Sequence, residues 1–225
     1  MTDTLLEMQD IRDRVVTAVL PHVPFEGWSA KALRLAAVDA GFDPTMGERA
    51  FPGGAVAAVE HFAQMADRQL ERDAAGAKFD DLRTPDRIAW LVKQRLLPWA
   101  EHREAIRRAL TLLSLPSNAD VALRATWRTV DSLWYAAGDG ATDFSFYTKR
   151  VTLAAIYSAT LFYWLEDGSE DFEDSWSFLH RRIEDAGRLP KLRRDLQKRL
   201  ENLPNLLALL SGLQRQKRPR FGVRG

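Results

Sequence analysis

The 225-residue chain contains no cysteine and only four histidines. The absence of cysteine excludes disulfide bridges, thiolate metal ligands and cysteine nucleophiles. The histidines form neither a His-Glu-x-x-His nor a Glu-x-x-His motif, and the acidic run 166–174 lacks the Asp-x-Asp-x-Asp-Gly order of calcium loops. No glycine-rich phosphate-binding loop is present in the sequence. We therefore expect no metal site, no cofactor, no catalytic residues and no enzymatic activity.

Charged residues are missing from the segment Val151–Leu165, which has fifteen residues. As a helix this segment would span only ~22 Å, which is short of the ~30 Å hydrocarbon core of a bilayer. It also contains Thr152 and Tyr157, which are partly polar. We therefore expect a buried central helix here rather than a transmembrane one.

Basic residues are missing from the start of the chain, where the acidic residues are Asp3, Glu7 and Asp10. Secretory signal peptides begin with a basic region and an apolar one, and transit peptides are rich in arginine. The first ten residues have neither character. We therefore expect a cytoplasmic protein.

The net charge of +1 conceals a strong asymmetry. From Arg188 to Gly225 there are eleven lysine and arginine residues and two acidic ones, a balance of +9, so the preceding 187 residues carry −8. An acidic body with a basic tail indicates that the tail meets an anionic surface, either a membrane or a nucleic acid.

Helical patterns recur along the chain, and no segment shows the sustained alternation of a strand. Hydrophobic residues make up 46% of the sequence, which is enough for a sizeable core. Apolar spacing and the usual start and stop residues predict helices over 4–20, 30–40, 85–100, 101–114, 118–137, 143–166 and 174–187, and one more that begins at Gly53. We therefore predict an all-α fold.

Several helix starts carry a recognisable capping residue. Ser29 is expected to cap the helix over 30–40, which Gly41 would close. Asp43 and Thr84 each precede a proline, so each is expected to be an N-cap followed by proline at the first helical position.

The first seventy residues have the rhythm of a helix-turn-helix unit. A DNA-reading helix would offer basic and polar side chains at its N-terminal end. The corresponding segment, Asp43–Gly54, has one basic residue and two acidic ones, and it is interrupted by Pro52-Gly53-Gly54. A ligand-responsive DNA-binding regulator therefore remains only an alternative, and we expect no nucleic-acid partner.

Aromatic and aliphatic residues concentrate in the helices predicted over 118–137 and 143–166. Helical bundles form ligand sites between helices, and an apolar ligand requires little beyond apolar walls. The residues that could line such a cavity are Trp127, Val130, Trp134, Leu153, Ile156, Tyr157, Leu161 and Trp164. The same spacing is equally typical of a solid core, because periodicity does not distinguish filled from hollow packing.

The segment Gly138–Arg150 places charged and aromatic residues beside a glycine-rich turn. Aromatic residues next to charges at the start of a helix are typical of a binding surface, although internal packing is the alternative. The residues predicted to contact a partner are Asp143, Phe144, Phe146, Tyr147 and Arg150.

The tail carries leucines at intervals of three or four between basic residues. Such an amphipathic helix gains apolar burial and attraction to anionic lipid, although a dimer seam or a helix docked on the body would show the same pattern. The residues predicted to bind the membrane are Leu203, Leu206, Leu207, Leu210, Leu213, Arg215 and Lys217.

Five ordered motifs relate the chain to a known family. They are the segments His22–Ser29, Phe51–Gly54, Glu104–Leu110, Thr129–Arg150 and Phe178–Ile183. In these motifs the sequence closely resembles the lipid-binding accessory proteins of ubiquinone biosynthesis, which have a TetR-like helical fold. Ser145 and Phe146 depart from the residues usual in the family, while the aromatic character of the partner surface is kept.

The resemblance implies a bundle with three parts: a helix-turn-helix-like part over 1–72, a lipid-binding body over 73–189 and an amphipathic basic helix and tail over 190–225. It implies a homodimer that is not an enzyme. It also implies that the protein binds isoprenoid quinone intermediates and presents them to the di-iron demethoxyubiquinone hydroxylase. We accordingly expect peripheral association with the inner face of the cytoplasmic membrane.

Overall fold

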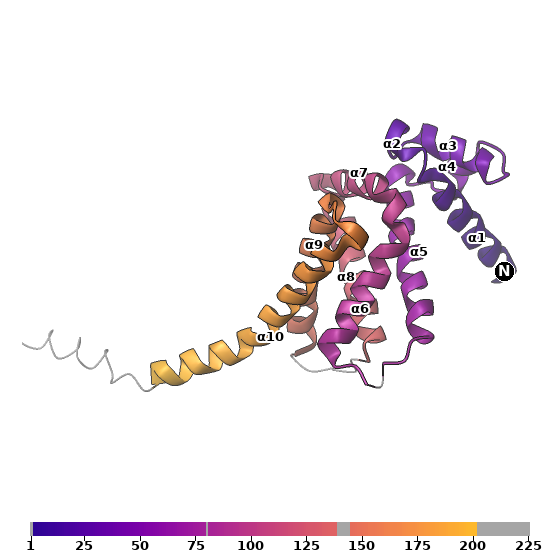
Figure 1. The fold of residues 1–225 in the computed structure, drawn as a ribbon. Coiled ribbons are helices and arrows are strands. Elements are labelled where there is room, and N and C mark those ends of the chain that lie inside the picture. The colour runs from indigo at the N-terminus through magenta and orange to yellow at the C-terminus, as the bar shows by residue number, and fades with distance from the viewer. Residues whose placement is uncertain (1, 80, 139–144, 202–225) are drawn as a thin grey trace, which may run out of the picture. The chain divides into compact units, whose positions relative to one another are not determined.

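The computed structural model describes residues 2–79, 81–138 and 145–201, which are helical over most of their length and contain no strand. Figure 1 shows the course of the helices. The α-helices are α1 (Thr2–Val19), α2 (Val23–Glu26), α3 (Ala30–Asp39), α4 (Met46–Ala50), α5 (Gly54–Ala75), α6 (Thr84–Leu96), α7 (Arg103–Leu113), α8 (Ala119–Ala136), α9 (Ser145–Glu166) and α10 (Glu173–Glu201). Three short 3-10 helices accompany them: η1 (Leu97–His102), η2 (Pro116–Asn118) and η3 (Glu170–Phe172).

The N-terminal part is formed by α1, α3 and α4, which pack against one another. Ser29 caps α3 as predicted, because its hydroxyl accepts a hydrogen bond from the Ala32 amide at 3.1 Å. Gly41 follows α3 with a φ of +81°, a conformation that favours glycine. Gly47 on α4 lies so close to the carbonyl group of Leu33 that an added Cβ would collide with it. Glycine therefore allows α4 to sit directly on α3.

Two predicted N-caps are wrong by one or two residues. The cap of α6 is Arg83, with extended backbone, and Thr84 is already helical. Asp43 accepts hydrogen bonds from the amide and hydroxyl of Thr45, but Thr45 is the residue that precedes α4. In both cases a short turn before the helix shifts the boundary, which sequence patterns locate least precisely.

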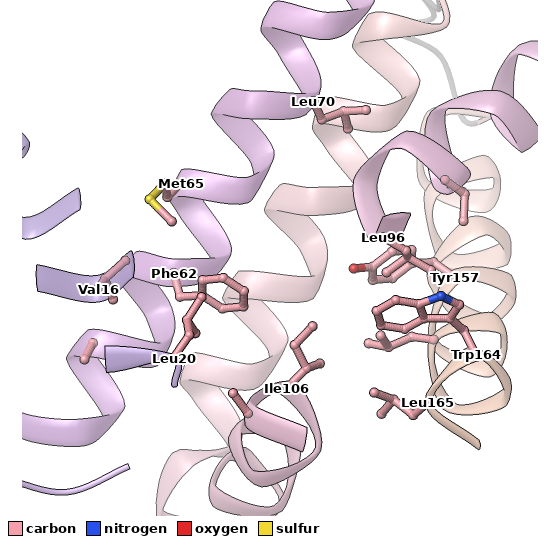
Figure 2. Packing of buried hydrophobic residues seen from close by; sticks show 14 of the residues in the cluster. Val16, Leu20, Phe62, Met65, Leu70, Leu96, Ile106, Tyr157, Trp164 and Leu165 are labelled. Atoms are coloured by element: carbon pink, nitrogen blue, oxygen red, sulfur yellow. The ribbon is translucent and has the colours of Figure 1, made fainter. Parts of the chain in front are cut away.

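The body is built on α5, which packs against α1, α6 and α8, while α8 packs against α9. The indole of Trp28 connects the N-terminal part to the body, since its Nε1 donates to the carbonyl oxygen of Ala105 on α7 at 2.9 Å. Figure 2 shows buried residues of α5, α6, α7 and α9, among them Phe62, Leu96, Ile106 and Trp164, in one apolar interior. Burial of these side chains is the main source of stability.

Helix α9 packs one side into the core, as expected of a buried central helix, but its other side is exposed. Leu153, Leu161 and Trp164 are buried, but the side chains of Val151 and Phe162 are 62% and 58% exposed. Within the described residues α9 packs against α7 and α8, and its outer side keeps exposed apolar residues. Within the described ranges, none of the helices has the length and apolar character that crossing a membrane would require.

Residues Met1–Ile183 form one compact unit, and Glu184 begins a second. The first turns of α10 belong to the first unit, where Trp176 and Leu179 join the core. The helix predicted to stop at residue 187 instead continues past Pro190 to Glu201. Proline removes one helical hydrogen bond but has a φ close to the helical value, so a helix can continue through it with a kink.

A candidate apolar ligand site

A cavity of about 280 Å³ lies inside the first unit, between helices α5 to α9. Figure 2 shows four of its lining residues, Phe62, Leu96, Ile106 and Tyr157, from four different helices. The remaining lining residues are Val59, Ala63, Arg95, Trp99, Ala109, Leu110, Leu113, Ser114, Ala122, Ala125, Thr126, Thr129, Ser158, Leu161 and Phe162. The volume is close to the lower end of the ~300–1,000 Å³ typical of small-molecule sites.

Small side chains leave this space open. Ile106, Ala109, Leu110 and Leu113 recur at helical spacing and turn one side of α7 toward the cavity. Ala109 on α7 is matched by Ala125 on α8, and both are buried. Because alanine ends at Cβ, neither side chain extends far into the cavity.

A buried polar cluster lies at one end of this apolar space. The Nε of Arg95 donates to Oδ1 of Asp67 at 2.9 Å, and its Nη2 donates to the carbonyl oxygen of Ala63 at 3.1 Å. The Thr129 hydroxyl donates to Oδ1 of the same carboxylate at 2.8 Å, and Nε of Arg128 donates to Oδ2 at 3.2 Å. Arg95 and Thr129 both line the cavity. Buried charges are tolerated when they are paired and hydrogen-bonded, as here.

Tyr157 on α9 faces the same end of the cavity and is buried. Burial raises the pKa of its phenol, because desolvation disfavours the phenolate. The group is therefore neutral at physiological pH and available as a hydrogen-bond donor.

The opposite end of the cavity reaches the surface between α7 and α9. Phe162 lines this end and is 58% exposed. A neighbouring groove shares Leu110, Ser114 and Phe162 with the cavity and continues to Arg107 and Glu166. A ligand longer than the cavity therefore has an apolar path to the surface.

The sequence prediction of the lining residues overlaps this cavity at two positions, Tyr157 and Leu161. The structure places the other predicted residues elsewhere. Val130, Leu153 and Trp164 are buried in the core. The three that remain are partly buried or exposed at its edge: Trp127, Trp134 and Ile156.

Sequence reasoning missed the contributions of α5, α6 and α7. The signal for α7 was present, because its apolar residues follow a clear helical period over residues 106–113. No comparable signal marked Arg95 or Asp67, since a charged residue on a predicted helix is usually solvated. Their burial becomes visible only when the helices are packed.

Some of the residues predicted to contact a partner are described in the structure, and others are not. Asp143 and Phe144 lie outside the described residues, as does the side chain of Phe146. Tyr147 is 63% exposed, and its ring lies 6.4 Å from that of Trp127. Arg150 was expected at the surface, but its side chain is buried and pairs with Oδ1 of Asp131 at 2.7 Å. Arg150 therefore links α8 to α9 from inside.

All residues predicted to bind the membrane lie outside the described structure, in 202–225. They are Leu203, Leu206, Leu207, Leu210, Leu213, Arg215 and Lys217. Among the described residues, no group of three or more histidine or acidic side chains is arranged to hold a metal ion.

Known proteins resemble the chain in both sequence and fold. Residues 119–190 match the COQ9 family model. The mitochondrial ubiquinone biosynthesis protein COQ9 of Drosophila melanogaster is 34% identical over 183 residues, which are 80% of this chain and 56% of that protein. Human mitochondrial COQ9 is 33% identical over 188 residues, or 79% of this chain and 58% of that protein. The chain thus matches a little over half the length of these curated relatives.

The fold is that of a TetR-type protein. The crystal structure of a TetR transcriptional regulator from Nitrosomonas europaea superposes with a TM-score of 0.65 at 22% identity, and the match covers 79% of this chain and 98% of the regulator. The predicted all-α, TetR-like bundle is therefore confirmed. Taken together, the matched domain, the homologues and the fold show that this chain is a COQ9-family protein with a TetR-like helical fold.

Proposed function

We propose that the protein is a lipid-binding accessory protein of ubiquinone biosynthesis. In this proposal it binds isoprenoid quinone intermediates and presents them from a membrane to a quinone-modifying hydroxylase. The observation that carries the proposal is the apolar cavity between α5 and α9 in a chain whose relatives are named ubiquinone biosynthesis proteins. It acts without chemistry of its own.

Apolar walls suit a prenyl chain energetically. Burial of one methylene group contributes about 0.8 kcal/mol, so one five-carbon isoprenoid unit gains about 3–4 kcal/mol on leaving water. The cavity of about 280 Å³ takes only part of a long lipid. The rest would lie along the groove beyond Phe162 and Leu110, where the membrane or a protein partner can reach it.

The residues at the inner end of the cavity favour an accessory role over catalysis. Two titratable residues line this end. Near pH 7 the guanidinium of Arg95 stays charged and the phenol of Tyr157 stays neutral, so neither exchanges a proton readily.

The hydroxylase is expected to meet the protein near the start of α9, where Tyr147 is exposed. Peripheral contact with the inner face of the cytoplasmic membrane would come from the basic tail.

Filling the cavity tests the proposal directly. Ala125→Leu adds three carbon atoms at a buried lining position, and it should reduce the lipid that copurifies with the protein several-fold. Ala155→Leu makes the same change on the exposed side of α9 and should leave the lipid content unaltered. The measurement is mass spectrometry of extracted lipid, with circular dichroism as the check on folding. Absence of lipid from the unmodified protein, together with no thermal shift on adding a prenylated quinone, would contradict the proposal.

The TetR-like fold keeps a DNA-binding regulator as a second candidate. The structure weighs against it, because the cations of α3 are engaged: Lys31 pairs with Glu26 at 2.8 Å and Arg34 pairs with Glu48 at 2.5 Å. Helix α4, at the position of a recognition helix, has only five residues. A gel-shift experiment with genomic DNA fragments at low salt would detect such binding, and we expect none.

A further inference from the structure

The cavity has a polar end and an apolar end. Arg95, Thr129 and Tyr157 lie at the inner end, and all three are at least nine-tenths buried. Phe162 and Ser114 lie at the outer end and are exposed. A ligand that only required apolar walls would need no polar group at the closed end, where each such group costs desolvation energy.

The inner end offers hydrogen-bond donors. A guanidinium group carries five N–H groups, and for Arg95 the acceptors are Asp67 and Ala63. Among the described residues the phenol of Tyr157 makes no hydrogen bond, and Tyr157 lines the cavity. A ligand atom in the cavity would supply the missing acceptor.

The charges around this end are already balanced. Asp67 accepts from Arg95 and Arg128, and Arg128 also lies 3.8 Å from a carboxylate oxygen of Glu60. A carboxylate from a fatty acid would therefore add an uncompensated negative charge in a desolvated place, which is costly. A neutral oxygen acceptor carries no such cost.

We propose that a quinone lipid enters the cavity with its oxygen-bearing ring head first. A carbonyl or phenol oxygen of the ring would accept hydrogen bonds from Tyr157 and Arg95, and the prenyl chain would leave past Phe162. The inference rests on the proposed function, which already names the quinone lipid, and adds its direction of binding and the residues that hold its head.

The inference is tested with two small probes of matched shape. One is a benzoquinone that carries a single prenyl unit, and the other is prenylbenzene, which has the same chain on a ring without oxygen. Tyr157→Phe removes one hydroxyl group from the inner end. It should weaken quinone binding about 3- to 10-fold, which corresponds to one net hydrogen bond, and leave prenylbenzene binding unchanged. Tyr163→Phe, the same change on α9 outside the cavity, should alter neither.

Infrared spectroscopy provides an independent readout. A carbonyl group that accepts a hydrogen bond absorbs at lower frequency, so the C=O stretch of the bound quinone should lie below its value in hydrocarbon solvent. In Tyr157→Phe it should move back toward that value. If the variant loses helicity, the spectrum of the unmodified protein still tests whether the quinone carbonyl group accepts a hydrogen bond.

Each result separates the inference from the proposed function. If both probes bind but Tyr157→Phe changes neither the quinone affinity nor the C=O frequency, the head-first inference is overturned and the lipid site stands. Tighter binding of decanoate than of the quinone would also overturn it. If neither probe binds the unmodified protein and Ala125→Leu makes no difference, the proposed function itself fails.

Discussion

Asp67 organises the interior at the scale of single residues. Its two carboxylate oxygens accept from Arg95, Thr129 and Arg128, which come from α6 and α8, while Asp67 itself belongs to α5. Three helices therefore share one buried anion. Removal of one partner from such a cluster destabilises the fold, because the remaining buried charge has no compensation. It also holds Arg95 and Thr129 in place at the inner end of the cavity.

A second carboxylate, Asp167, fixes the turn between α9 and α10. Its Oδ1 accepts from the amide of Ser169 at 2.8 Å, and its Oδ2 accepts from the amide of Ser175 at 2.9 Å. Both serine hydroxyl groups donate to it as well. Burial raises the pKa of Asp167, but these hydrogen bonds outweigh burial and lower its pKa to about 2.

This lowered pKa predicts how stability depends on pH. The folded state binds the proton of Asp167 more weakly than the unfolded state does, so the stabilisation is present at neutral pH and is lost as the pH falls from about 4 to about 2. Asp167→Asn should therefore lower the free energy of unfolding at pH 7, and its difference from the unmodified protein should shrink below pH 4. Urea unfolding at several pH values measures this. Asp174→Asn makes the same change at a nearby exposed position and serves as the control. If Asp167→Asn lowers the free energy of unfolding equally at pH 7 and pH 2.5, the prediction is contradicted.

At the scale of elements, α9 has two apolar sides with different surroundings. Leu153, Leu161 and Trp164 face the core, while Val151 and Phe162 are exposed. Water-exposed aromatic and branched residues along one helix are typical of interaction surfaces. Family resemblance adds the expectation of a homodimer and of a hydroxylase partner, and both stay predictions.

The start of α9 is the place to test the predicted contact with a hydroxylase. Tyr147 is exposed beside Trp127, so lysine at position 147 should disturb the surface and leave the core intact. We expect Tyr147→Lys to reduce copurification with the di-iron hydroxylase at least tenfold, because aromatic anchors contribute most to interface energies. Tyr135→Lys introduces the same charge at an exposed position of α8 and should have little effect.

Circular dichroism decides how this result is interpreted. Loss of helicity in Tyr147→Lys would mean that the ring belongs to the fold and is not part of a docking surface. Unchanged copurification at native helicity would remove the start of α9 as the contact.

At the scale of the whole molecule, the charge asymmetry separates the body from the tail. Residues 188–225 carry an excess of nine positive charges, whereas the rest of the chain is acidic. Each basic residue near an anionic lipid surface contributes about 1 kcal/mol, and each fully buried leucine about 1.5–3 kcal/mol. Partial immersion and the ordering of the helix offset part of these gains.

We therefore predict that the full chain floats with vesicles containing anionic lipid and that removal of residues 202–225 abolishes this. Leu206→Glu combined with Leu210→Glu should weaken binding even at low salt, because the apolar anchor is lost while the basic residues remain. Raised salt should weaken binding of the unmodified protein as charges are screened. Equal flotation of the shortened and complete chains would favour a tail that docks or dimerises instead.

The sequence by itself determined the helices, because their apolar periods and caps such as Ser29 are local properties. Its ordered motifs also determined the family. Helix starts such as α6 were less exact, since the true cap, Arg83, has no preference that a pattern can detect.

Only the tertiary structure decided which side chains enclose the cavity. A helical period shows which side of a helix is apolar. It does not show which other helix covers that side, or whether small residues such as Ala109 and Ala125 line the same cavity. The burial of Arg95 and Arg150 was decided in the same way, because each has an acidic partner on another helix. Packing brings these distant residues together, and that is why the polar end of the cavity is visible in three dimensions but not in the sequence.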